Sequence, residues 1–128
     1  MRALTTEWIE KAEGDFNTAL RESRARKSPN YDAVCFHCQQ CAEKYLKAFL
    51  QERNIQSPKV HNLNDLLELI LPADSSFEFQ RSYLKDLTKF AVEFRYPGER
   101  AVEEDAIGAL QTTKRIRKFV RQKLKLKE

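Results

Sequence analysis

Apolar residues recur along the chain at the spacing of helices. Between residues 31 and 50 the intervals alternate between four and three, which is the spacing of one helix face, in a stripe formed by Tyr31, Cys35, Cys38, Ala42, Tyr45 and Phe49. A second apolar stripe on another side of the same segment contains Phe36, Leu46 and Leu50. A helix with two apolar faces is packed from more than one side, so we expect this helix to be central.

Helix caps and breakers divide the rest of the chain into four further helices. The first runs from about residue 6 to 24, with Thr5 or Thr6 as its N-cap, and the central helix ends at about residue 53. A short helix from Leu63 ends at Pro72, and a capping box of Ser75 and Glu78 begins the next, which ends near residue 94. The last runs from residue 103 into a basic tail. The sequence therefore predicts an all-α fold, an antiparallel up-and-down bundle of four or five helices.

Length and composition indicate one globular domain spanning residues 1–128. Charged residues make up 33% of the chain, with only 3 glycines and 4 prolines, which argues against disorder. No apolar run approaches the ~20 residues of a membrane span. The N-terminal segment carries acidic residues where a signal peptide needs an apolar region. We therefore expect a cytoplasmic protein that does not associate with membranes.

The net charge of +4 conceals an uneven distribution. Residues 1–113 carry 15 bases and 18 acids, whereas a basic C-terminal tail (114–128) contains Lys114, Arg115, Arg117, Lys118, Arg121, Lys123, Lys125 and Lys127. Cations at the end of a helix complement the helix dipole, which is one interpretation of the tail. The other interpretation is an anionic partner, either nucleic acid or nucleotide.

The three cysteines form a C-x2-C-x2-C pattern that superficially resembles an iron–sulfur motif. Cluster ligands normally come from a loop, whereas Cys35 and Cys41 lie about 120° apart on a helix with ~100° per residue. There is no fourth cysteine. We expect buried, inert thiols, and neither a metal site nor a cofactor.

Two groups of polar residues are candidates for a binding surface. A polar line on the central helix contains His37, Gln40, Lys44 and Lys47, and Arg95 and Tyr96 stand at the break before the last helix. Arginine and lysine suit phosphate, Tyr96 suits base stacking, and Gln40 suits a base edge. The alternative is that these residues have structural roles, in which the lysines are solvated and the histidine and glutamine side chains hold helices together.

Three stretches at this spacing resemble the HEPN domain, the higher-eukaryote and prokaryote nucleotide-binding domain. They are WIEKAEGDFNTAL, FHCQQCAEKYLKAFL and FRYPGE. The resemblance covers nearly the whole chain and implies a helical bundle that is often a homodimer. It also implies a frequent partner, a minimal nucleotidyltransferase, in toxin–antitoxin or related systems. Active members are metal-independent ribonucleases in which four to six residues separate an arginine from the following histidine.

The chain departs from that catalytic pattern. If Arg95 is the arginine of the motif, the histidine position is occupied by Arg100, Ala101 or Val102, none of which can act as a base at neutral pH. The resemblance therefore implies a non-catalytic module of the RYP type that binds nucleotide or RNA. Two alternatives stay open: a ribonuclease with a relocated base, His37 or His61, and a dimerising scaffold without a ligand.

Overall fold

In the part of the chain that the structure describes, the protein forms five α-helices and one 3-10 helix. The computed structural model describes residues 1–57, 59–94 and 96–127, with Ala91 described by its backbone alone. The elements are α1 (Ala3–Ser23), α2 (Tyr31–Glu52), α3 (Leu63–Ile70), η1 (Ser75–Gln80), α4 (Arg81–Glu93) and α5 (Glu103–Lys123). These described ranges contain no strand, and the predicted all-α bundle is confirmed.

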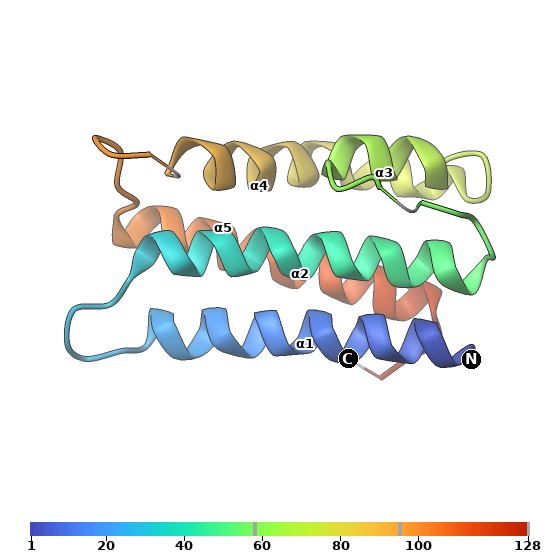
Figure 1. Cartoon of the computed structure of the whole chain (residues 1–128), viewed down its shortest axis with the longest axis horizontal. Helices are drawn as coiled ribbons and strands as arrows, with labels where there is room; N and C mark the ends of the chain where they lie inside the picture. Colours follow the sequence, from blue (N-terminus) through green and yellow to red (C-terminus); the bar gives the residue numbers. More distant parts are fainter. Residues whose placement is uncertain (58, 95, 128) are drawn as a thin grey trace.

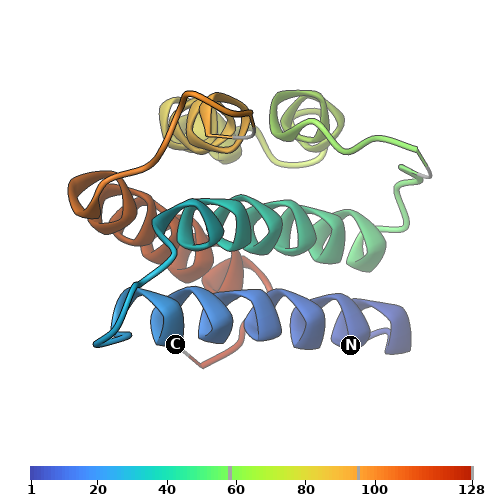
Figure 2. The ribbon, with the colours of Figure 1, turned by 60° about the vertical axis from the view of Figure 1, so that its left-hand side comes forward.

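The helices lie in three layers with α2 in the middle one. Figure 1 shows α1 antiparallel to α2 on one side, α3 and α4 on the other, and α5 behind α2. The view in Figure 2 separates α3 and α4 from the layer of α2 and α5. Because α2 contacts α1, α3, α4 and α5, the prediction of a central second helix is confirmed.

The two apolar stripes of α2 are both used within the single chain. Tyr45, Leu46 and Leu50 are at most 1% exposed, and Cys38 and Ala42 are fully buried. Only Phe36, at 45% exposure, has a large part of its apolar side chain in solvent. The second stripe is therefore largely covered by the other helices, and little of it is left for contact with a second copy.

The start of α1 differs from the prediction. The helix begins at Ala3 and its N-cap is Arg2, whereas the sequence favours Thr5 or Thr6 as the cap. Thr5 is fully buried inside the first turn, and its hydroxyl donates a 2.9 Å hydrogen bond to Glu52 Oε1. The backbone N–H of Arg2 donates to the same oxygen at 3.1 Å. A carboxylate at the end of α2 thus replaces the local cap, which sequence spacing alone does not reveal.

The predicted capping box before α4 is also wrong. Asp74, rather than Ser75, caps the chain there: its Oδ1 accepts a 3.0 Å hydrogen bond from the Ser76 backbone N–H. The following residues form η1, and α4 proper begins only at Arg81. Glu78 does not close the box but accepts a 2.5 Å hydrogen bond from Arg81 Nε.

The helices are amphipathic, in keeping with a mean hydropathy of −0.65. On α5, Ile116 is buried whereas Lys114 and Arg115 are exposed. In the part of the chain that the structure describes, no helix has the length and apolar character needed to cross a bilayer.

Candidate functional site

The first half of the polar line on α2 is bound to a carboxylate of α1. His37 Nδ1 lies 2.7 Å from Asp15 Oδ1, and the Lys44 ammonium donates to the other oxygen of the same carboxylate. Asp15 is only 9% exposed, whereas the His37 side chain is 29% exposed. Two of the predicted ligand-binding residues therefore balance a buried charge between α1 and α2. The contact fixes the His37 ring and directs its Nε2 away from Asp15.

The second half of the line forms a separate cluster. Lys47 Nζ donates to Glu43 Oε2 at 3.1 Å and lies 3.0 Å from His61 Nδ1. Both Lys47 and Glu43 are 7% exposed, so Lys47 is a buried cation and not a solvated one. The ammonium also lies 5.3 Å from the centroid of the Trp8 ring, which is a cation–π contact. His61, whose side chain is 70% exposed, covers this cluster on the solvent side.

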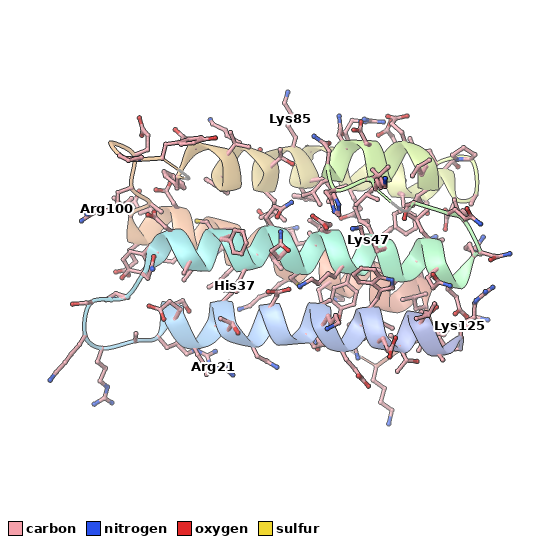
Figure 3. The ribbon with its side chains drawn as sticks, viewed as in Figure 1. Arg21, His37, Lys47, Lys85, Arg100 and Lys125 are labelled. Carbon is pink, nitrogen blue, oxygen red and sulfur yellow. The ribbon has the colours of Figure 1, made fainter. Side chains whose placement is uncertain are left out.

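Figure 3 shows His37 and Lys47 along the same stretch of α2, beside α1. The line predicted from helical spacing thus exists, but its members have different partners. Gln40, between the two clusters, is half-buried and donates a 2.9 Å hydrogen bond to Gln39 Oε1. Of the four residues, Gln40 is the one without a charged partner in the described part of the chain.

At the break between α4 and α5, Tyr96 is 65% exposed. Arg95, the other predicted residue there, lies outside the described residues. Gly98 has a φ of +96°, a backbone conformation that glycine adopts without strain, and it turns the chain between the two helices. Ala101 is 3% exposed, and its N–H donates a 2.7 Å hydrogen bond to Asp32 Oδ1 at the start of α2.

Four cations of the basic tail make contacts that hold the bundle together. Arg117 binds the Glu13 carboxylate with both Nε, at 2.8 Å, and Nη2, at 2.5 Å. Arg121 donates to the hydroxyl of the buried Tyr45 at 3.0 Å. Lys123 pairs with Asp74 at 2.8 Å, and the guanidinium of Arg115 lies over the Tyr83 ring. These four cations therefore contact side chains of other helices and loops, a role that neither interpretation of the tail included.

The three cysteines are free and buried, as expected. Burial raises the pKa of Cys35 to about 12 and that of Cys38 to about 11, and it raises the pKa of Cys41 well above its ordinary value. Thiolate, the metal-binding and nucleophilic form, is therefore scarce at neutral pH. Among the described residues, no three His, Cys, Asp or Glu side chains are arranged to hold a metal ion.

Sequence reasoning missed Asp15, the carboxylate that binds the first half of the polar line. A signal for Asp15 was present, because it lies on the apolar side of α1, three residues after Ala12 and four before Ala19. Both of those alanines are fully buried. An acid on a buried stripe needs a cation, and α2 supplies Lys44.

The sequence model of the HEPN domain matches residues 5–123. The chain therefore belongs to the HEPN family, as its motifs indicated. The crystal structure of TT1696 from Thermus thermophilus is similar, with 26% identity, a TM-score of 0.78 and coverage of 93% of this chain and 97% of that one. The crystal structure of ST0689, an archaeal HEPN homologue, has 24% identity, a TM-score of 0.69 and coverage of 96% and 98%, which supports the fold alone. No curated protein matches the sequence.

Proposed function

We propose that this HEPN domain binds RNA or nucleotide without cutting it and acts beside a minimal nucleotidyltransferase in a toxin–antitoxin-like system. The observation that carries the binding part is Tyr96. A tyrosine ring at 65% exposure, next in sequence to an arginine and four residues before the exposed Arg100, offers a base a stacking surface beside cations.

The region after Arg95 supports binding rather than catalysis. Ribonuclease chemistry needs a group that takes a proton from the ribose hydroxyl, and Arg100, Ala101 and Val102 offer none. Ala101 is buried, with its backbone N–H bound to Asp32, so its Cβ does not face solvent. His61, one of the two candidates for a relocated base, contacts Lys47 and Glu43 through Nδ1.

The test of binding is a titration of mononucleotides and short RNA against wild-type protein, Arg95→Ala and Tyr96→Ala, at low and moderate salt. Phosphate contacts weaken as salt rises, so wild-type affinity should fall with salt and Arg95→Ala should bind less tightly. Tyr96→Ala should lose affinity at every salt concentration, because stacking is not ionic. Absent binding would leave a scaffold, and equal binding by all three proteins would show that Arg95 and Tyr96 do not contact the ligand.

The partners follow from family membership. HEPN domains are often dimeric, and we propose a homodimer and a nucleotidyltransferase partner on that basis. Affinity capture of the tagged protein from its native host, with identification of the bound protein and nucleic acid, tests the partner. Capture without a nucleotidyltransferase at native expression would contradict it.

A second candidate function has one specific observation in its favour. Asp15 holds Nδ1 of His37, which is how a carboxylate orients a histidine that acts as a base through Nε2. A ribonuclease with a relocated base would use this pair. Lys44 binds the same carboxylate, which favours the structural role, so we rank this candidate second.

A further inference from the structure

Three pockets adjoin one another across the open side of the bundle. The first, of about 450 Å³, lies between Trp8 and His61. The second, of about 260 Å³, lies between Phe36 and Thr88 and shares His61 with the first. The third, of about 450 Å³, shares Thr88 with the second and continues along α4 to Lys85 and Lys89. The surface made of these three pockets is called here the amide groove, and its lining residues come from α1, α2, α3, α4 and the loop between α2 and α3.

The groove is unusually rich in amide side chains. Seven of the chain's twelve asparagines and glutamines line it, namely Gln39, Gln40, Gln51, Asn54, Gln56, Asn62 and Asn64. An amide carries two donors on nitrogen and an acceptor oxygen, so it can match the mixed donors and acceptors on the edge of an unpaired base. Four of the seven also bond within the chain: Gln40 donates to Gln39, Asn62 caps α3, and Asn64 accepts from Arg81.

Each of the first two pockets also has an aromatic wall. Trp8 lines the first, and Phe36, 45% exposed, lines the second. Phe36 and Lys47, the latter beside Trp8, are eleven residues apart on α2, which places them about 16 Å apart along the helix axis. Two aromatic walls at that separation suit a ligand longer than a single nucleotide. Aromatic rings stack on any base, so they supply affinity without demanding a sequence.

Charge along the groove places the phosphates toward α4. In the first two pockets Lys47 is neutralised by Glu43, so a phosphate gains little there. In the third, Lys85 and Lys89 are exposed, and neither has an ion-pair partner among the described residues. Figure 3 shows Lys85 extending from α4 into solvent. Asp65 is the one acid among the described residues lining this pocket, so two cations face one carboxylate.

We infer that the amide groove binds a short stretch of single-stranded RNA. Unpaired bases enter the pockets beside Trp8 and Phe36, and the phosphates lie toward Lys85 and Lys89. The inference rests on the proposed RNA-binding function and narrows it to an unpaired strand of more than one nucleotide. It also shifts binding away from His37 and Lys44, which are occupied by Asp15.

The chain contains one tryptophan, Trp8, so tryptophan emission reports on the first pocket of the groove. Full-length protein is titrated with fluorophore-labelled single-stranded RNA of eight nucleotides, with the anisotropy of the label and the emission of Trp8 each measured. Duplex RNA of the same length, single mononucleotides and inorganic phosphate are the other arms. We expect the single strand to bind and to change Trp8 emission, with weaker responses to the other three. Tighter binding of mononucleotide than of octamer would overturn the inference of a strand.

Three variants and their matched controls locate the site. Phe36→Ala should weaken octamer binding about fivefold or more, because it removes a stacking ring, whereas Phe79→Ala on the exposed η1 should not. Lys89→Ala should lower the salt dependence by about one counterion, whereas Lys114→Ala on α5 should not. Gln56→Ala should weaken binding and Gln111→Ala should leave it unchanged. All six positions are exposed, so the folds should survive, which circular dichroism checks.

The two proposals fail differently. If anisotropy detects no RNA binding at all, the proposed function fails. If RNA binds while Trp8 emission stays constant and the control variants lose affinity instead, the function stands and the groove assignment is wrong. Loss of affinity in Lys114→Ala alone would place the RNA on α5.

Discussion

The hydroxyl of Tyr45 donates a 2.7 Å hydrogen bond to Oε2 of Glu13 and thereby connects α2 to α1 inside the bundle. Arg121 donates to the same hydroxyl, and Arg117 binds the Glu13 carboxylate with two nitrogens. A ring that the apolar pattern of α2 assigns to the core thus carries a polar atom shared by three helices. The network also explains why part of the basic tail is not available to an external anion.

Tyr45→Phe should lower the free energy of unfolding by about 1 kcal/mol, the usual contribution of a buried hydrogen bond. The ring stays, so no cavity forms, but Glu13 and Arg121 each lose a partner. Urea denaturation followed by circular dichroism measures the change. Tyr96→Phe is the matched control, because that hydroxyl belongs to a ring with 65% exposure. Equal stability of Tyr45→Phe and wild type would show that the network adds nothing.

The same network predicts a loss of stability in acid. Burial alone would raise the pKa of Glu13, but hydrogen bonds from Arg117 and Tyr45 outweigh it and hold the pKa below its ordinary value. A carboxyl with a lower pKa in the folded state contributes stability above its unfolded pKa and loses it as pH falls through the folded pKa. The free energy of unfolding should therefore fall below about pH 4.5, near the ordinary value of a glutamate. In Glu13→Gln the fall over that range should be smaller, although the variant is less stable at pH 7.

Asp15 is a largely buried carboxylate that contacts two side chains of α2, Lys44 and His37. Asp15→Ala leaves Lys44 and His37 beside a cavity without their carboxylate, and it should cost roughly 3 kcal/mol of unfolding free energy. Thermal and urea unfolding measure the loss. Asp86→Ala, at an exposed position of α4, is the matched control and should change stability little. A small effect at Asp15 would mean that water compensates the two side chains.

The helices were predictable because their signal is local. The four-three spacing of α2 and the proline at position 97 specify a central helix and the end of α4 within a residue or two. The cap at Thr5 was predicted wrongly because its hydroxyl binds Glu52, which is 47 residues away, whereas the cap at Ser75 was displaced by one residue to Asp74. Helix caps compete with any carboxylate that tertiary packing brings near.

The polar contacts within the candidate site were less predictable for the same reason. Glu13 and Arg117 are 104 residues apart, and no pattern in either helix connects them. Helical spacing correctly placed His37 and Lys44 on one side of α2, but it could not say that Asp15 of α1 covers that side. The three pockets of the amide groove depend on how α1, α2 and α4 meet, and that is a property of the packed bundle.

The cysteines should be unreactive in the folded protein. Burial raises the pKa of Cys35 to about 12 and of Cys38 to about 11, so the thiolate fraction at pH 8 is small. We expect Ellman's reagent to label none of the three thiols within minutes in native buffer and all three in 6 M guanidinium. Prompt native labelling, or iron or zinc retained after purification, would contradict the interpretation of inert core residues.

A homodimer is a further prediction, but the apolar surface of α2 on which it was based is smaller in the structure than expected. The expected surplus of apolar surface on α2 is reduced to Phe36, since Leu46 and Leu50 are buried within the chain. A homodimer is still expected from the family. Multi-angle light scattering at micromolar concentration should give twice the 15.0 kDa mass of the chain. A monomer mass under those conditions would remove the homodimer from the proposed function.

The last prediction is that the purified protein does not cut RNA. If Arg95 is the arginine of the ribonuclease motif, the histidine positions are occupied by Arg100, Ala101 and Val102, and none of these can act as a base at neutral pH. Structured and unstructured RNA should therefore remain intact on a denaturing gel over hours, with and without a metal chelator.

If RNA is cleaved, His37→Ala and His61→Ala identify the source, because loss of activity in one variant alone assigns the base. Asp15→Asn should then slow a His37-dependent reaction, because it would no longer hold the imidazole with a charged oxygen. Cleavage unaffected by either histidine substitution would point to a contaminating nuclease, whereas cleavage dependent on His37 would replace the binding module with the relocated-base ribonuclease.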